Sequence, residues 1–276
     1  MTMQINQLFE QIHNVPRVPE IVRTLITQLD NPQTNFDEIA KNVEKEQIIS
    51  LKVLRLVNSA HFGLSKKVGT IQDAVIMLGL HQLRILVVAS GIVSSIPKIE
   101  NFDIKQFWTN SFNTAIYSKW LATAIKTGPD LAFTAGLISG LGNILIRLGA
   151  PDKAIEIDRQ LSQNGTRQTI ELSVLGFTGE SVCSELCRRW NFSPELIDAI
   201  AHCGAPLDAL EINKTASVVY LARFISECKS AGTTAEHILQ AFPFQVASTI
   251  GLEEKFIVEK LPVILALESG LGGLSD

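Results

Sequence analysis

Apolar residues recur at helical spacing along nearly the whole chain, and this periodicity limits the fold more than any other feature. Ile21, Leu25 and Leu29 are four residues apart, which places them on one face of a helix. Segments with the same spacing are separated by proline and glycine, which end helices. The sequence shows no sustained alternation of apolar and polar residues joined by Asn-Gly or Asp-Gly turns, the pattern of paired strands. We therefore expect an all-α protein.

The middle of the chain predicts two long helices. One covers residues 104–126, and a turn at 127–130 separates it from an apolar helix over 131–148, for which Asp130 is the expected N-cap. The second helix contains three glycines, Gly136, Gly140 and Gly142. Each costs about 1 kcal/mol relative to alanine unless close packing requires it. The three glycines therefore predict that another segment approaches this helix closely.

Local signals also predict helices in the first third of the chain. A helix follows Pro19, a residue tolerated in a first helical turn. Thr70 is the expected N-cap of a helix over 71–78, which Gly79 ends. An almost entirely apolar helix over 81–96 is expected to lie deep between other helices.

The composition excludes several classes of protein. With 46% hydrophobic and 19% charged residues, the 276-residue chain is expected to fold around a sizeable core. Its 24 Lys and Arg against 28 Asp and Glu give a net charge of -4, so we expect no nucleic-acid partner and no anionic membrane surface. The N-terminus lacks the pattern of a secretory signal, and we expect a cytoplasmic protein.

A polar joint at residues 98–103 and an interruption near Gly232 divide the chain. We predict an N-terminal helical lobe over residues 1–97, a second helical lobe over 98–231 and a C-terminal helical extension over 232–276. The expected architecture is a two-lobed helical bundle.

Familiar catalytic and metal-binding motifs do not occur. The five histidines are scattered, with no HExxH and no His-Asp dipeptide, and there is no P-loop or GxSxG. Cys183 and Cys187 share a helical face without a nearby histidine, so buried packing is favoured over metal binding. The four cysteines lack the dense pattern of a disulfide framework, and reduced, mostly buried thiols are expected.

An ordered set of residues before position 85 nevertheless forms a pattern. Two prolines precede an apolar helix that ends in Asn-Ser, and a Phe-Gly, a second helix and a Leu-Arg follow. These residues are Pro16, Pro19, Leu54, Arg55, Asn58, Ser59, Phe62, Gly63, Leu78, Gly79, Leu83 and Arg84. The chain from about 15 to 203 resembles the HD-related output domain, HDOD, which implies an all-α, HD-like fold.

HDOD is related to HD and HD-GYP phosphohydrolases, in which histidines and aspartates hold metal ions that activate water. The motif Ala-Gly-Leu-Leu-His-Asp-Ile-Gly-Lys of those enzymes is AGLISGLGN in this chain. The resemblance therefore places Ser139 and Gly140 at the His-Asp pair and Asn143 at the lysine. The implied metal centre has lost its defining ligands.

The other implied ligand positions are altered as well. Asn110 and Gly179 correspond to histidines, Arg223 corresponds to an aspartate, and His202 is near a further family histidine. Serine, glycine and asparagine do not supply the carboxylate and imidazole donors that Mg, Mn or Fe need. A guanidinium repels a cation, and we expect Arg223 to pair with a carboxylate in the former pocket. No metal or other cofactor is expected.

The resemblance implies a bacterial signal-transduction module that acts by protein contacts and not by turnover, with homodimerisation left open. For Arg55, Asn58 and Ser59 we favour helix capping over partner contact. Two alternatives stay open. One is a residual metal-dependent phosphohydrolase, and the other is a regulatory module that binds a nucleotide or small anion near Arg223 and His202.

Overall fold

The computed structural model describes most of the chain. The residues described are 3–12, 36–45, 47–58, 67–77, 79, 83, 87, 99, 102–163, 165–190 and 192–267. Every regular element within these ranges is an α-helix, which confirms the all-α class. The predicted helix after Pro19 lies outside the described residues. So does the predicted helix over 81–96, except Leu83 and Val87, which are helical and buried.

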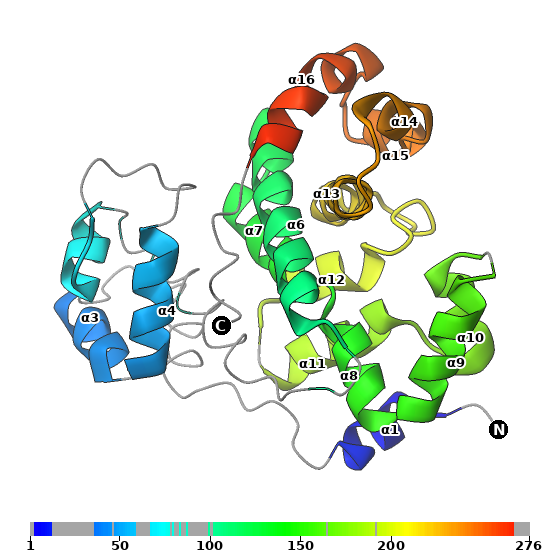
Figure 1. The fold of residues 1–276 in the computed structure, drawn as a ribbon, viewed down its shortest axis with the longest axis horizontal. Helices are drawn as coiled ribbons and strands as arrows, with labels where there is room; N and C mark the ends of the chain where they lie inside the picture. Colours follow the sequence, from blue (N-terminus) through cyan, green and yellow to red (C-terminus); the bar gives the residue numbers. More distant parts are fainter. Residues whose placement is uncertain are drawn as a thin grey trace. The chain divides into compact units, whose positions relative to one another are not determined.

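The helices are numbered as in Figure 1. In chain order they are α1 (Ile5–Gln11), α3 (Phe36–Lys45), α4 (Gln47–Val57), α6 (Ile104–Ala124), α7 (Pro129–Ile138), α8 (Leu141–Gly149), α9 (Pro151–Leu161), α10 (Arg167–Val174), α11 (Gly179–Arg189), α12 (Pro194–His202), α13 (Lys214–Ser230), α14 (Ala235–Gln240), α15 (Phe244–Thr249) and α16 (Glu254–Ala266). Residues 71–77 are also helical.

The chain forms two compact units. The larger contains α1, the part of α6 from Asn113 onwards and α7 to α16, and the smaller contains α3, α4, residues 71–77 and α6 up to Phe112. The division falls inside α6, between Phe112 and Asn113, so this continuous helix contributes to both units. These boundaries differ from those of the three segments expected from the sequence, which are 1–97, 98–231 and 232–276. Helices α14 to α16 pack in the same unit as α13.

The larger unit is built around α7, α8, α11, α12 and α13, which contact one another in sequence-distant pairs such as α8 with α11 and α7 with α13. Helices α14, α15 and α16 gather at one end of this unit, and α1, α9 and α10 lie at the other (Figure 1). The Arg189 guanidinium joins α1 to α11, since it donates to Asn6 Oδ1 at 2.9 Å and lies 4.1 Å from the Phe9 ring centroid.

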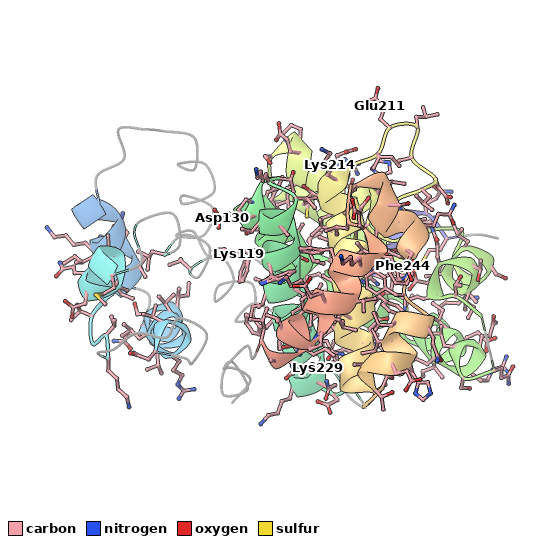
Figure 2. The ribbon with its side chains drawn as sticks, turned by 90° about the horizontal axis from the view of Figure 1, so that it is seen from above. Lys119, Asp130, Glu211, Lys214, Lys229 and Phe244 are labelled. Atoms are coloured by element: carbon pink, nitrogen blue, oxygen red, sulfur yellow. The ribbon has the colours of Figure 1, made fainter. Side chains whose placement is uncertain are left out.

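The structure corrects the expected single helix over 131–148. It is two helices, α7 and α8, with a break at Ser139 and Gly140. Asp130 is not the N-cap, because α7 already starts at Pro129 after Gly128. Proline is well suited to the first helical position. The Asp130 carboxylate instead lies 3.1 Å from Lys119 Nζ of α6. Both residues are labelled in Figure 2.

The predicted close approach to the glycines is confirmed at two of the three positions. A Cβ on Gly136 would lie 2.7 Å from Ser118 Oγ and 2.9 Å from Ala115 Cα, so α7 rests directly on α6. A Cβ on Gly142 would collide with Gly179, the first residue of α11. The helix penalty of these glycines is offset by contacts that a side chain would prevent.

In the smaller unit, α3 packs on α4, and Asn58 ends α4. The Asn58 amide donates to Val68 O at 2.8 Å and its Oδ1 accepts from Val68 N at 2.7 Å. Thr70 caps the next helix by accepting from Asp73 N, as predicted. Gly79 has a φ of +77°, the conformation expected of a glycine that ends a helix. Asn58 thus holds the end of α4 to the backbone of Val68. Arg55 is exposed on α4, and Ser59 lies outside the described residues.

The stretch Pro129–Gly149 is long and apolar enough to cross a membrane by length and composition, with a mean hydropathy of 1.6. Two thirds of it, 67%, is buried inside the protein. Burial of this kind is typical of core helices.

Candidate functional site

Three of the positions where the resemblance implies metal ligands, Ser139, Gly140 and Gly179, lie where α7 meets α8 and α11 begins. Ser139 is buried at the α7–α8 break, and its hydroxyl donates to Gly136 O at 3.1 Å. Gly140 is the N-cap residue of α8 and carries no side chain. The two positions that hold the His-Asp pair in related enzymes therefore present a hydroxyl turned to its own helix and bare backbone.

Gly142 and Gly179 bring the starts of α8 and α11 into direct contact. A Cβ built on Gly142 would lie only 1.8 Å from Gly179 O, far inside van der Waals distance. A Cβ on Gly179 would lie 2.7 Å from Asn143 Oδ1. Backbone therefore fills space next to a position where the resemblance implies a metal ligand. The neighbouring cavity lined by Asn143 and Arg167 measures about 10 Å³, which is at the limit for one water molecule.

Glu171 secures the N-terminus of α11. Its carboxylate is completely buried, accepts from Gly179 N at 2.6 Å, and lies 3.3 Å from Arg167 Nη1. Burial raises the pKa of Glu171, and the hydrogen bond from Gly179 together with the charge of Arg167 opposes the rise. Thr178 caps the same helix by accepting from Ser181 N. A carboxylate at a helix N-terminus is electrostatically favoured.

Arg223 of α13 pairs with Glu180 of α11. Nη1 lies 2.7 Å from Glu180 Oε1, and the two side chains are 20% and 11% exposed. Glu180 is thus the carboxylate partner expected for Arg223 from the sequence. Burial acts to raise the pKa of Glu180, but the charge and hydrogen bond of Arg223 outweigh it and hold the pKa below 4.5. Gly204 lets the backbone after α12 approach this carboxylate, since a Cβ there would lie 2.7 Å from Glu180 Cδ.

An open pocket of about 450 Å³ lies beside this ion pair. Its walls come from the start of α10, Glu180 of α11, the segment after α12, one face of α13 and Val246 of α15. Arg223 lines this pocket, but His202 does not. The ring of His202 turns instead to its own helix, with Nδ1 2.9 Å from Asp198 O and 3.2 Å from Asp198 Oδ1.

Asn110 belongs to the smaller unit. It lies on α6, where its Oδ1 accepts from Gln106 Nε2 of the preceding turn at 2.8 Å. Its assignment to a family ligand position stays a prediction from the resemblance.

The side chains at the family ligand positions do not fit a divalent metal. Ser139 bonds its own helix, Gly140 and Gly179 offer no side-chain donor, and Arg223 is positive. The carboxylates of Glu171 and Glu180, which lie next to these positions, each face a guanidinium group. Within the described ranges there is no group of three or more His, Cys, Asp or Glu placed to hold a metal ion. Hard cations need several oxygen ligands with carboxylate charge.

The described cysteines agree with the expected reduced, mostly buried thiols. Cys183, Cys187 and Cys203 are buried, Cys228 is half-buried, and all four are free. Burial raises the pKa of Cys203 to about 12, which makes it an inert thiol at neutral pH.

Comparison with known proteins supports the resemblance seen in the sequence. Residues 15–206 match the model of the HDOD domain. The chain belongs to the HDOD family. Its HD-like helical fold is shared with a Shewanella amazonensis protein named "Putative phosphohydrolase", which is 29% identical with a TM-score of 0.83 and 98% coverage of both chains.

Two further relatives extend the comparison of this HDOD chain. A Marinobacter aquaeolei protein named "Putative signal transduction protein" is 20% identical, with a TM-score of 0.78, and the match covers 98% of this chain and 65% of that one. An uncharacterized protein of Treponema pallidum is 23% identical over 233 residues, or 83% of this chain. The chain spans 45% of the length of that relative.

Replacing Gly142 by alanine tests the closed contact between α8 and α11. We expect Gly142→Ala to lower the free energy of unfolding by about 3 kcal/mol or more, because the new Cβ collides with the backbone of Gly179. Gly128→Ala is the matched control, since its Cβ meets only Leu131 Cβ at 3.6 Å and its φ is -57°. Urea titration measures both, and equal stability of the two variants would contradict the contact.

Glu180→Gln tests the ion pair with Arg223. Breaking a mostly buried pair leaves a charge without its partner, and we expect a loss of about 3 kcal/mol in unfolding free energy at pH 7. The folded pKa of Glu180 lies below its ordinary value, so the pair stabilises the protein above pH 4.5 and this stabilisation is lost as the pH falls. The difference between wild type and variant therefore shrinks in acid.

Glu185→Gln, on the same helix, is the control for that experiment. Glu185 pairs with Arg189 in a more exposed position, where an ion pair contributes about 0.5 kcal/mol. Chemical unfolding between pH 3 and pH 7 provides the comparison. A deficit in Glu180→Gln that stays constant over this range would contradict the assigned role of the ionised carboxylate.

Proposed function

We propose that this HDOD protein is a non-catalytic output or adaptor module of bacterial signal transduction, located in the cytoplasm and acting through contacts with other proteins. The observation that carries the proposal concerns the positions where the resemblance implies metal ligands, since Ser139, Gly140 and Gly179 offer no carboxylate or imidazole there. A backbone contact between Gly142 and Gly179 and an Arg223–Glu180 ion pair stand beside those positions.

Electrostatics support a site without a metal. A divalent ion near Arg223 would meet a guanidinium whose charge is fixed, since burial acts against the charge but Glu180 and Glu227 raise the pKa further above its ordinary value. The ion would also have to displace that guanidinium from Glu180, at 2.7 Å. Metal-activated water would therefore lack both donors and a favourable field.

Signalling by contact is supported by two observations. One structural neighbour is named as a signal transduction protein. The smaller unit also presents adjacent apolar side chains to solvent, with Ile76 80% and Met77 47% exposed. Apolar side chains left in water are favoured as contact residues for another protein.

A residual metal-dependent phosphohydrolase is the competing function. It is favoured by the name of the 29% identical Shewanella neighbour. The carboxylates of Glu171 and Glu180 lie near the positions where the resemblance implies metal ligands, and each faces a guanidinium.

Turnover distinguishes the two functions. We expect the purified protein to hydrolyse bis(p-nitrophenyl) phosphate at the rate of buffer containing the same Mn²⁺, because no ligand set holds the metal. Release of nitrophenolate measures the rate. Metal-dependent turnover that falls in Arg223→Met and Glu180→Gln, both checked for folding by circular dichroism, would establish the hydrolase.

Capture from lysate of a bacterium that natively encodes this chain tests the contact function. We expect the tagged protein to retain a reproducible set of proteins, and Ile76→Asp to lose it because a charge replaces an exposed apolar contact residue. Ile155→Asp is the control, since Ile155 is 66% exposed in the larger unit. Quantitative mass spectrometry compares the three samples, and an identical set from wild type and Ile76→Asp would contradict the assigned surface.

A further inference from the structure

The pocket beside the Arg223–Glu180 pair has the size and form of a small-molecule site. Its volume of about 450 Å³ lies within the range of roughly 300–1,000 Å³ found for such sites. Four helices and the segment after α12 contribute to its walls. All of the residues that line the pocket belong to the larger unit.

The two cations that line the pocket already face carboxylates. Arg223 lies 2.7 Å from Glu180 Oε1. Arg167 lies 3.3 Å from Glu171 Oε1 and 3.8 Å from Asp158 Oδ1. Neither guanidinium therefore offers an uncompensated positive charge to an incoming anion.

Two further carboxylates line the same pocket. Glu227 and Asp208 are both exposed there, and the described residues give neither a close ion pair. Three carboxylates thus line the pocket against two guanidinium groups, with Glu180 as the third. The balance of charge favours a cation and opposes a nucleotide or other small anion.

Aromatic side chains complete the wall of α13. Tyr220 and Phe224 are half-buried, lie one helical turn apart and line the pocket on the same face as Glu227. Aromatic rings attract cations through their faces and give apolar contact to an alkyl chain. Carboxylates beside aromatic rings are a combination that recognises ammonium and guanidinium groups.

We propose that this pocket binds a small organic cation, an alkyl ammonium or alkyl guanidinium. Its charge faces Glu227 and Asp208, and its stem lies against Tyr220 and Phe224. The proposal is independent of whether the protein catalyses a reaction, and it gives the module a ligand-responsive site distinct from the protein-contact surface at Ile76.

Isothermal titration with agmatine tests the proposal, with pentan-1-ol and ADP as uncharged and anionic probes. Agmatine is expected to bind in low salt, more weakly as salt rises, and pentan-1-ol and ADP are expected to give no saturable heat. Glu227→Gln should weaken agmatine at least tenfold, and Phe224→Leu should weaken it as well. Glu211→Gln should bind like wild type, since Glu211 lies at the outer edge of the segment between α12 and α13 (Figure 2) and does not line the pocket.

The source of the cation is distinguished by a second titration. A capped Gly-Lys-Gly peptide that binds with the same Glu227 dependence, where agmatine does not, assigns the cation to a side chain of another protein. The proposal is overturned if ADP binds saturably and agmatine does not, or if neither cationic probe binds. It is also overturned if folded Glu227→Gln binds agmatine with wild-type affinity. Thermal unfolding of each variant confirms that the chain is folded before it is titrated.

Discussion

The direct contact between the starts of α8 and α11 is the constraint on which the rest of the site depends. The backbone of Gly179 can approach Gly142 this closely only because Gly142 carries no Cβ. Their contact fixes the N-terminus of α11, and Glu171 then reaches Gly179 N from α10. The next residue, Glu180, faces Arg223 of α13. One backbone contact therefore sets the positions of both buried carboxylates.

These carboxylates have different electrostatic roles. Glu171 is completely buried, and burial raises its pKa. Glu180 faces the buried guanidinium of Arg223, which holds its pKa below the ordinary value. The pKa values of these two glutamates thus shift in opposite directions, because the guanidinium that faces Glu180 is closer and less exposed than the one that faces Glu171. Because Arg223 pairs with Glu180, its positive charge is already compensated where it lines the neighbouring pocket.

Much of the helical fold could be predicted because its signals are local. Helical spacing and the cap at Thr70 depend on residues within a few positions. The break at Ser139 and Gly140 could not be predicted in this way, because it accompanies the approach of Gly179 from a distant helix. The apolar pattern continues across the break, so the sequence favours one helix where the structure has two.

Prediction of the candidate site from the sequence was limited in the same way, because contacts between distant helices bring its side chains together. The family resemblance identified Arg223, but its partner Glu180 looks like an ordinary acidic residue in a first helical turn. Glu171 carries no distinguishing sequence signal, because its burial comes from tertiary packing. His202 seemed a candidate through its family position, but a local contact with Asp198 accounts for its orientation.

Metal binding by the folded protein tests the central claim most directly. Crystals grown with Mn²⁺ would be measured above and below the manganese absorption edge, and the anomalous difference map searched around Ser139, Gly179 and Arg223. We expect no manganese peak there and an intact Arg223–Glu180 pair. A manganese peak coordinated by Glu171 or Glu180, with Arg223 displaced, would contradict it.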